Sequence, residues 1–445
     1  MKALFTKYTL LTMLFLLVFA IACKEDDPEP EYNAPSITAP ASTITLENGA
    51  PGQSVNFTVS VDPALTATFA ATGTGVTIAN ASGSISGTTL TINFAAGTTA
   101  GAGSIKVVVT DSEGQSDDAT AVLSIDPPIT QITVTSNITQ NQTWTSDKIY
   151  ILGGRITVVS GVTLTIDAGT IIKGQAGTGA NATALLVARG GKLKAEGTAA
   201  KPIIFTSIAD EIDQDDMAAG NFGSPNLDPD VNGLWGGVII LGKAKISASN
   251  ASGQLSEIQV EGIPTSDPNG LYGGTDDADD SGTIKYISIR HGGTNIGSGN
   301  EINGLTLGGV GSTTVIENVE VVANQDDGIE WFGGTVNVKN VVVWNVGDDG
   351  IDTDQSWSGT LDNFVVVTPT GHCFELDGPE GTYSAGHTIQ NGTIVVSSAD
   401  RVSEDIINTD ANSIVALKGL YFKSIKAGQI INRVDAQGFF RGYIT

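Results

Sequence analysis

Residues 317–334 read ENVEVVANQDDGIEWFGG, residues 339–359 read KNVVVWNVGDDGIDTDQSWSG, and residues 362–378 read DNFVVVTPTGHCFELDG. The three units align with a period of 22–23 residues, each with an asparagine, a valine run and a glycine-containing turn in register. Such a period is typical of one rung of a parallel β-solenoid with three short strands. A leucine-rich repeat needs a leucine-rich pattern that the units do not have, and a propeller needs about 40 residues per repeat.

The alignment predicts where the side chains of each rung lie. Two apolar columns are expected to stack inside the coil: Val319, Val341 and Phe364, and Ile329, Ile351 and Phe374. A third column consists of Asn318, Asn340 and Asn363, with Asn391 in a looser fourth unit. Asparagine tolerates a left-handed backbone, and its amide can hydrogen-bond to the next rung, so this column is expected at a turn.

The overall composition agrees with an all-β chain of two or three domains. The 445 residues include 55 glycines, and charged residues make up only 16%. Many short Val/Ile/Thr runs are separated by Gly, Asn and Ser, and long amphipathic helical patterns are absent. The formal net charge of −26 repels nucleic acid and polyanionic lipid but favours divalent cations. We therefore exclude nucleic-acid binding.

The N-terminus predicts export and a lipid anchor. Residues 1–22 carry two lysines before a short apolar run, as in a secretory signal peptide. The small residues before Cys23 resemble a bacterial lipobox, although Ala20 stands where leucine is usual. The resemblance implies that Cys23 is lipidated and anchors the chain. The alternative is an ordinary cleaved signal with an incidental cysteine.

Residues 23–35 are predicted to form an acidic tether. Its beginning, Lys24-Glu25-Asp26-Asp27, resembles the signal that sends Bacteroidota lipoproteins to the outer face of the outer membrane. The expected location is thus the cell surface, with a lipid anchor in the outer membrane. Only Cys373 would remain as a thiol, so no intramolecular disulfide is expected in this exported chain.

Residues 36–128 are predicted to form an immunoglobulin-like β-sandwich. Runs such as SVNFTVSV (54–61), SIKVVVTD (104–111) and ATAVLSID (119–126) alternate apolar and polar residues between turns. The last two runs form a hairpin that resembles bacterial immunoglobulin-like or cadherin-like modules. We expect a spacer or an interaction module here, and a right-handed parallel β-helix over residues 129–445.

Four motifs resemble one family in order along the chain. NGLWGGVIILGKA (232–244), NEINGLTLGGVGSTT (300–314) and the two boxes that begin at Asp326 and Asp348 are similar to uncharacterised Bacteroidota surface lipoproteins with a pectin-lyase-like β-helix. The resemblance covers residues 130–400. It implies a right-handed parallel β-helix and leaves the function open.

The two Asp-Asp-Gly-Ile-acid boxes predict a cluster of carboxylates. In adjacent rungs, Asp327 and Asp349 would lie about 4.8 Å apart, where two charges repel by roughly 3 kcal/mol at an effective dielectric of 20. A bound cation, a shared proton, or splaying into solvent as an acidic stripe would each relieve this repulsion. Ca²⁺ takes six to eight oxygen ligands. The candidate ligands are Asp326, Asp327, Glu330, Asp348, Asp349, Asp352 and Asp354.

A catalytic interpretation comes from a second resemblance. Asp327, Asp348, Asp349 and His372 stand at spacings similar to the acid and histidine boxes of polygalacturonases. The resemblance implies that Asp348 or Asp349 is the acid, that Asp327 belongs to a base pair, and that His372 orients them. The first box lacks the asparagine of that family, and its Arg-Ile-Lys box has no counterpart.

Aromatic residues and a loop add weaker candidates. Trp331 and Trp357 flank the acidic boxes and are predicted to stack on sugars, whereas Trp344 lies in an apolar run that suggests the core. DPDVNG (228–233) resembles the start of a calcium loop but has Ile239 where glutamate is needed. A half-buried structural thiol is expected at Cys373, since no cationic setting that would activate it is evident.

These observations predict three alternative functions. The first is a surface lipoprotein whose β-helix binds a polysaccharide or a cell-surface partner, through an acidic face loaded with Ca²⁺. The second function is that of a polysaccharide hydrolase or lyase. The third is that of a purely structural adhesin or stalk.

Overall fold

The computed structural model describes residues 31–127, 130–261, 263–297 and 300–432. The chain divides into two compact units, residues 1–129 and residues 130–445. The predicted fold class, a β-sandwich followed by a parallel β-helix, is confirmed. No helix in the described part of the chain is long and apolar enough to span a membrane.

The first unit is the sandwich of two sheets. One sheet has the order β1 (Ser36–Thr38), β3 (Gln53–Ser60), β7 (Thr89–Ala96) and β5 (Val76–Ile78). The other has the order β2 (Ile44–Glu47), β9 (Ser116–Asp126), β8 (Gly101–Asp111), β4 (Ala67–Thr74) and β6 (Ser82–Ser84). Alternate residues of β3 are buried, and Phe57 packs with Ile92 and Val107 between the sheets. The alternating pattern of the sequence thus builds one core.

The second unit is a solenoid with two main parallel sheets. We call them the long sheet and the short sheet. The long sheet runs β10 (Gln131–Val134), β12 (Ile149–Leu152), β15 (Ile171–Gly174), β18 (Ile203–Ser207), β24 (Gly282–Arg290), β28 (Val315–Val322), β30 (Val338–Trp344), β32 (Thr360–Val367), β34 (His387–Val395) and β36 (Val415–Lys423). Three further strands join it: β11 (Gln142–Trp144), β14 (Thr163–Ile166) and β17 (Lys192–Glu196).

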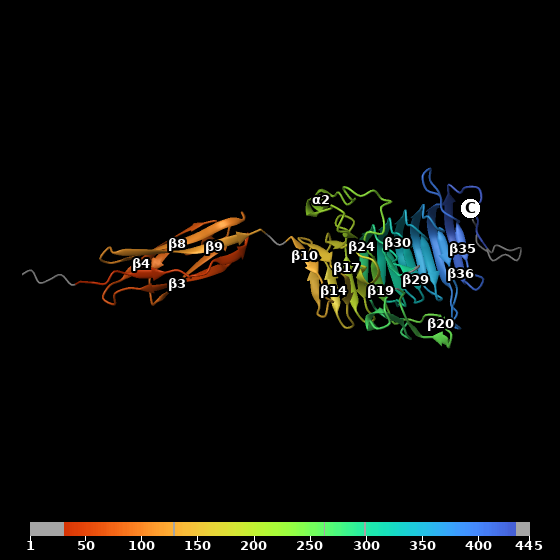
Figure 1. The fold of residues 1–445 in the computed structure, drawn as a ribbon, viewed down its shortest axis with the longest axis horizontal. Helices are drawn as coiled ribbons and strands as arrows, with labels where there is room; N and C mark the ends of the chain where they lie inside the picture. The colour runs from red at the N-terminus through yellow and green to blue at the C-terminus, as the bar shows by residue number, and fades with distance from the viewer. Residues whose placement is uncertain (1–30, 128–129, 262, 298–299, 433–445) are drawn as a thin grey trace, which may run out of the picture. The chain divides into compact units, whose positions relative to one another are not determined.

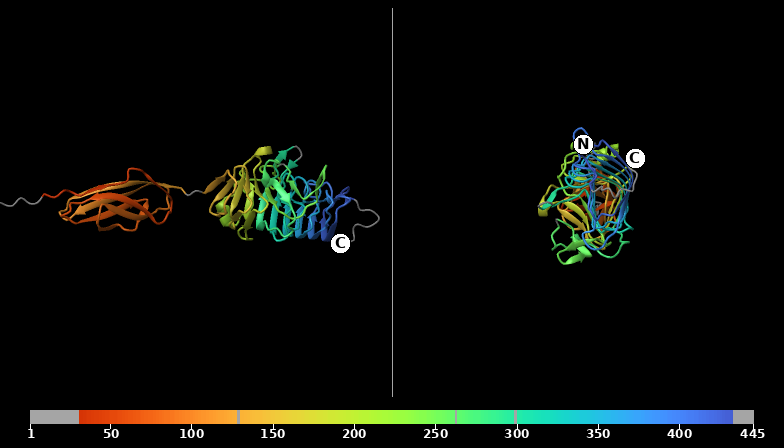
Figure 2. Two further views of the ribbon diagram at one scale, coloured as in Figure 1. Left: turned by 90° about the horizontal axis from the view of Figure 1, so that it is seen from below. Right: turned by 90° about the vertical axis from the view of Figure 1, so that its right-hand side faces the viewer.

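The short sheet closes each rung on the other side. Its strands are β13 (Arg155–Val158), β16 (Ala184–Val187), β19 (Val238–Leu241), β27 (Leu305–Gly308), β29 (Ile329–Phe332), β31 (Ile351–Asp354), β33 (Phe374–Leu376) and β35 (Ile407–Thr409). The rungs of this unit stack along one axis (Figure 2).

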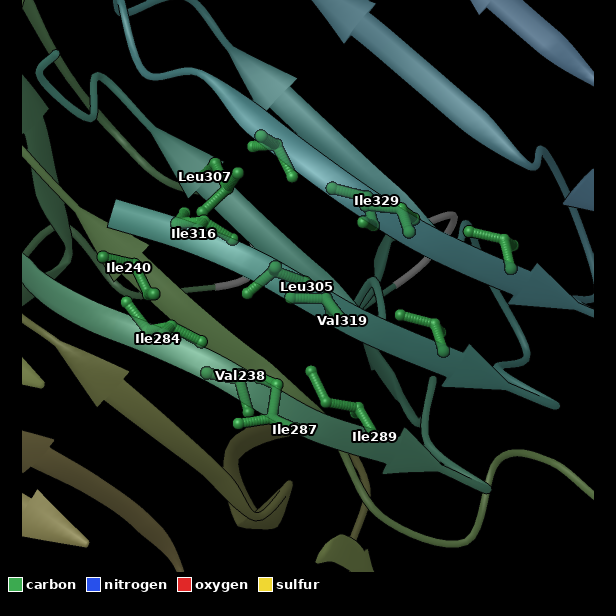
Figure 3. Close-up of a cluster of buried hydrophobic side chains, with 14 of the residues drawn as sticks. Val238, Ile240, Ile284, Ile287, Ile289, Leu305, Leu307, Ile316, Val319 and Ile329 are labelled. Carbon is green, nitrogen blue, oxygen red and sulfur yellow. The ribbon is translucent and has the colours of Figure 1, made fainter. Parts of the chain in front are cut away.

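Both predicted apolar columns are in register. Val319 pairs with Val341 in the long sheet, and Ile329 pairs with Ile351 in the short sheet. Their side chains belong to one continuous buried cluster. Figure 3 shows the two sheets contributing to it, with Ile316 and Val319 from one and Leu305 and Ile329 from the other. Each rung therefore buries the apolar face of the next.

The asparagine column occupies a left-handed turn within the long sheet, as predicted. Asn318, Asn340 and Asn363 all have a φ of 58°. The Asn340 amide donates to Asn318 Oδ1 at 3.0 Å, and the Asn363 amide donates to Asn340 Oδ1 at 2.7 Å. Asn391 does not continue this ladder of asparagine side chains, because its amide donates to Asp362 Oδ1.

Two insertions cover parts of the solenoid. The first contains α2 (Gln214–Ala219), and its Ile212 and Met217 pack on the outward side of the long sheet. The second contains the two hairpins β20 (Ala248–Asn250)–β21 (Gly253–Leu255) and β22 (Glu257–Gln259)–β23 (Leu271–Gly273). Short elements complete the solenoid: η1 (Gly179–Asn181), η2 (Pro268–Gly270), β25 (Asn295–Gly297) and β26 (Asn300–Glu301). Figure 1 shows α2 and β20 at opposite edges of this unit.

Candidate functional site

Strand alternation decides which residues of the acidic boxes face outward. In β29, Ile329 and Trp331 point into the core, so Glu330 and Phe332 point away from it. Phe332 is covered by the second insertion, where its ring lies 5.9 Å from that of Tyr272. Glu330 belongs to a polar column on the outward side of the short sheet.

The predicted sugar-stacking role of Trp331 and Trp357 is wrong. Their side chains are 0% and 1% exposed, and their rings stack on each other at 4.6 Å inside the solenoid. The period-two alternation explains the burial, because Trp331 lies two residues after the inward-facing Ile329. Trp344 is the reverse case: it was expected in the core but is 38% exposed.

The outward polar column crosses five strands in register. It runs Thr306, Glu330, Asp352, Glu375 and Asn408. The stacking of Glu330 on Asp352 was predicted and is confirmed. Glu375 was missed, although it stands directly after Phe374, which aligns with Ile351. That alignment would have placed it in the acidic column.

A second column lies at the turn before these strands. Asp327 Oδ1 accepts the backbone N–H of Asp349 at 2.9 Å. Asp349 Oδ1 in turn accepts the backbone N–H of His372 and lies 3.1 Å from His372 Nδ1. The structure therefore brings together the predicted stack of Asp327, Asp349 and His372. Each aspartate also satisfies a backbone donor of the next rung, which is a structural role in itself.

The two columns meet in three groups of ligand atoms. Within each group the candidate atoms lie within 4.8 Å of one another. The groups are Asp326, Asp327 and Asp348; Asp327, Glu330 and Asp352; and Asp349, His372 and Glu375. We call these eight residues the acidic face. Six of the seven predicted metal ligands belong to it.

Asp354 is the predicted ligand outside these groups. Its Oδ1 accepts the N–H of Gln355 at 2.6 Å. Burial and the neighbouring Glu380 carboxylate raise the pKa of Asp354 to about 8. Its carboxyl group contacts Gln355 and lies near Glu380, and it belongs to none of the three ligand groups.

Burial sets the protonation of the acidic face. Asp327 and Glu330 are each 7% exposed. Burial, followed by repulsion from nearby carboxylates, raises the pKa values of Asp327, Glu330 and Asp352 well above their usual range. Asp352 also has a buried Oδ1 with no hydrogen-bond partner in the described structure. In the absence of a cation, burial and mutual repulsion therefore favour the protonated form of these groups.

The third group combines an ion pair with a protonated acid. The hydrogen bond to Asp349 raises the pKa of His372 to about 9. Burial, and then the hydrogen bond with Asp349, raise the pKa of Glu375 to about 8. An imidazolium and a neutral carboxyl group thus flank Asp349 at pH 7, and both can donate a proton.

The segment between β26 and β27 also reaches the acidic face. Asn303, which is 3% exposed, donates its amide N–H to Glu330 Oε2. Its own Oδ1 is buried without a partner in the described structure. An amide oxygen without a partner therefore lies beside the carboxylates, in addition to Oδ1 of Asp352. Oxygen donors of this kind suit Ca²⁺ or Mg²⁺, whereas the group with His372 also suits a transition metal.

The remaining candidates are the loop of residues 228–233 and the two cysteines. The loop of residues 228–233 lies beside the turn that leads into the acidic face, where Asn345 donates to Pro229 O at 3.3 Å.

Cys373 is 0% exposed, and burial raises the pKa of its thiol to about 12. It is therefore a fully buried structural residue. Cys23 lies outside the described residues.

A family model described as a pectate-lyase like beta helix domain matches residues 136–437. The structure of a Yersinia enterocolitica Family 28 exopolygalacturonase is similar over 88% of this chain and 80% of that one, at 13% identity and a TM-score of 0.21. No curated protein matches the sequence.

Proposed function

Because the chain belongs to the pectate-lyase-like β-helix family, we propose that it binds a glycan at the acidic face through a divalent cation, most simply Ca²⁺. The observation that carries this proposal is a set of three ligand groups at the short sheet and the turn before it, each with its candidate atoms within 4.8 Å of one another. Asp327 belongs to two of these groups, so it would contact a cation at either position.

The cation would resolve the electrostatic conflict of the acidic face. Buried carboxylates that lie close together are unfavourable when ionised, and either a proton or a metal can neutralise them. Glu330 and Asp352 would hold the ion from the sheet, and Asp327 from the turn. Ca²⁺ accepts more oxygen ligands than these residues supply. Hydroxyl or carboxylate oxygens of a sugar would complete its coordination.

The cell surface is the proposed location. The signal-like residues 1–22, the lipobox-like sequence before Cys23 and the acidic tether support export, lipidation and anchoring in the outer membrane of a Bacteroidota cell. The sandwich would then act as a spacer between the anchor and the β-helix. A glycan-binding domain carried in this way would meet extracellular polysaccharide.

The test is retention of the full chain on immobilised polysaccharides of several charge types, in Ca²⁺ and in chelator. We expect retention by at least one polysaccharide in Ca²⁺ and its loss in chelator. The variant Asp352→Asn should lose retention, whereas Asp126→Asn, at an exposed acid of the sandwich, should not. Retention that is equal in Ca²⁺ and chelator would contradict the proposal.

A second candidate function is hydrolysis or lysis of a polysaccharide. The observation that favours it is Glu375, whose pKa of about 8 keeps a proton beside Asp349 and His372. A protonated carboxyl group can serve the leaving oxygen while a second carboxylate activates water. This reading predicts reducing sugar or unsaturated product that Asp349→Asn abolishes. A purely structural adhesin would show neither cation-dependent binding nor turnover.

A further inference from the structure

The β-sandwich contains a cavity of about 550 Å³ at one end of its core. Its walls come from the end of β3, the loop of residues 61–66, the start of β4, the segment of residues 84–88 and the end of β8. Residues 31–35 reach the same end, because the backbone N–H and the side-chain amide of Asn33 both donate to Asp62 Oδ2. The cavity is thus separate from the acidic face, which belongs to the other unit.

Strand alternation places one carboxylate in the wall of this cavity. Ile105, Val107 and Val109 of β8 point into the core, and Asp111 is the next inward-facing residue of the same strand. Asp111 is 6% exposed and lies opposite the buried Ala67 of β4. The apolar core of the sandwich therefore ends on an acid that lines the cavity.

The protein satisfies only one of the two carboxylate oxygens of Asp111. Oδ1 accepts the backbone N–H groups of Glu113 at 3.0 Å and Gln115 at 2.9 Å, and so closes the turn between β8 and β9. Oδ2 is buried and has no hydrogen-bond partner among the described residues. A buried polar atom without a partner is costly, and the cost is larger for a charged group than for a neutral one. A positively charged donor would satisfy this oxygen best.

The other side chains around the cavity are apolar or carry hydroxyl groups. The apolar ones include Val59, Val61, Leu65 and Ile85, and the hydroxyl groups include those of Thr66 and Thr88. Val61 and Ile85 are only half-buried against the core, so they present apolar surface to the cavity. Among the described residues that line it there is no Lys, Arg or His. A cationic ligand would therefore meet no repulsion from the wall.

We propose that this cavity binds a small organic ammonium ion, namely a primary amine with a short alkyl chain. The ammonium group would donate to Asp111 Oδ2, and hydroxyl oxygens of the wall would accept its remaining N–H groups. The alkyl chain would lie on Val61, Leu65 and Ile85, which removes apolar surface from water. The volume is in the usual range of small-molecule sites, about 300–1,000 Å³. The sandwich would then be a ligand-binding unit as well as a spacer.

The available oxygen atoms favour an ammonium ion over a metal ion or a neutral ligand. Ca²⁺ takes six to eight oxygen ligands. Asp62, the other acid of the wall, already accepts the N–H of Ala64 on Oδ1 at 3.0 Å and both donors of Asn33 on Oδ2. Asp111 Oδ2 is thus the carboxylate oxygen left for a ligand. A neutral alcohol would leave its charge uncompensated.

The experiment follows methyl resonances of the full chain, labelled at Val and Leu, by NMR during titration with n-butylammonium. The signals of Val61 and Leu65, assigned with Val61→Ile and Leu65→Ile, should shift together and saturate in the millimolar range, as expected for so small a ligand. Asp111→Asn should weaken binding at least tenfold, because the amide keeps Oδ1 for the turn but removes the charge. The matched control Glu47→Gln, which neutralises an exposed acid at the end of β2, should leave binding unchanged.

Two further measurements separate the possible outcomes. n-Butanol has the same alkyl chain without the charge and should bind at least tenfold more weakly than n-butylammonium. Val61→Thr should weaken the binding of n-butylammonium more than that of methylammonium, which tests the apolar wall even if Asp111→Asn does not fold. Equal binding of n-butanol, displacement of n-butylammonium by Ca²⁺, or shifts that do not saturate would overturn the proposal. Unchanged binding in a folded Asp111→Asn variant would overturn it as well.

Discussion

At the scale of single residues, Asp349 links the fold to the chemistry of the acidic face. Its Oδ1 accepts the backbone N–H of His372 and also pairs with the imidazole of that residue. The aspartate is 2% exposed, so its charge acts in a poorly solvated setting. One side chain therefore both satisfies the turn of the next rung and holds a proton on a histidine.

We predict that Asp349→Asn lowers the pKa of His372 from about 9 towards its ordinary value of 6.5. The amide keeps an oxygen for the backbone N–H but loses the charge that stabilises the imidazolium. NMR titration of the imidazole resonances measures this pKa. The chain has three histidines, and His372→Asn assigns the signal. A pKa that stays near 9 in the variant would contradict the role of Asp349.

The same pair predicts a dependence of stability on pH. The pKa of His372 is higher in the folded chain than in the unfolded chain, so its stabilising contribution is complete below pH 6.5 and is lost as the pH rises through 9. In Asp349→Asn this contribution should be absent. We expect the variant to lose about 1–3 kcal/mol of unfolding free energy at pH 6 and less at pH 9.5, as measured by urea denaturation in chelator.

At the scale of elements, the asparagine column shows how a repeat is kept in register. Asn340 combines a left-handed backbone with hydrogen bonds to the rungs on both sides. Glycine would tolerate the backbone but lose both bonds, whereas alanine would lose the bonds and also strain the backbone.

We therefore predict an order of stability at position 340. Asn340→Gly should reduce the unfolding free energy of the β-helix by about 1–3 kcal/mol for two hydrogen bonds. Asn340→Ala should reduce it by about 1–2 kcal/mol more, because of the left-handed conformation. Urea denaturation followed by circular dichroism measures both. Equal stability of the two variants would show that backbone strain at this turn is unimportant.

The parts of the site that lie in the repeated units could be predicted from the sequence. The 22-residue period predicted that Glu330 stacks on Asp352, because a parallel register follows from an aligned repeat. The predicted role of Trp331 was wrong because the alternation of β29 turns this side chain inward with Ile329, whatever the neighbouring acid does. The contact of Asn303 with Glu330 could not be predicted, because Asn303 lies before β27, outside the aligned units, and reaches Glu330 only through the folded chain.

At the scale of the whole molecule, the proposed location rests on the N-terminal sequence. We predict that Cys23→Ala moves the chain from the membrane fraction to the soluble fraction of a lipoprotein-processing bacterium, because a lipid chain would no longer anchor it. Detergent phase partition followed by immunoblotting measures this. If the variant remained with the membrane, a lipid on Cys23 could not be the anchor.

Thermal unfolding in Ca²⁺ and in chelator tests the cation site most directly. A cation bound only to the folded chain must stabilise it, by about 2.7 kcal/mol at one hundred times its Kd. We predict a higher melting temperature for the β-helix in Ca²⁺ at pH 7.5, and no such rise in the triple variant Asp327→Asn/Glu330→Gln/Asp352→Asn. The same melting temperature for the natural chain in Ca²⁺ and in chelator would contradict a cation on the acidic face.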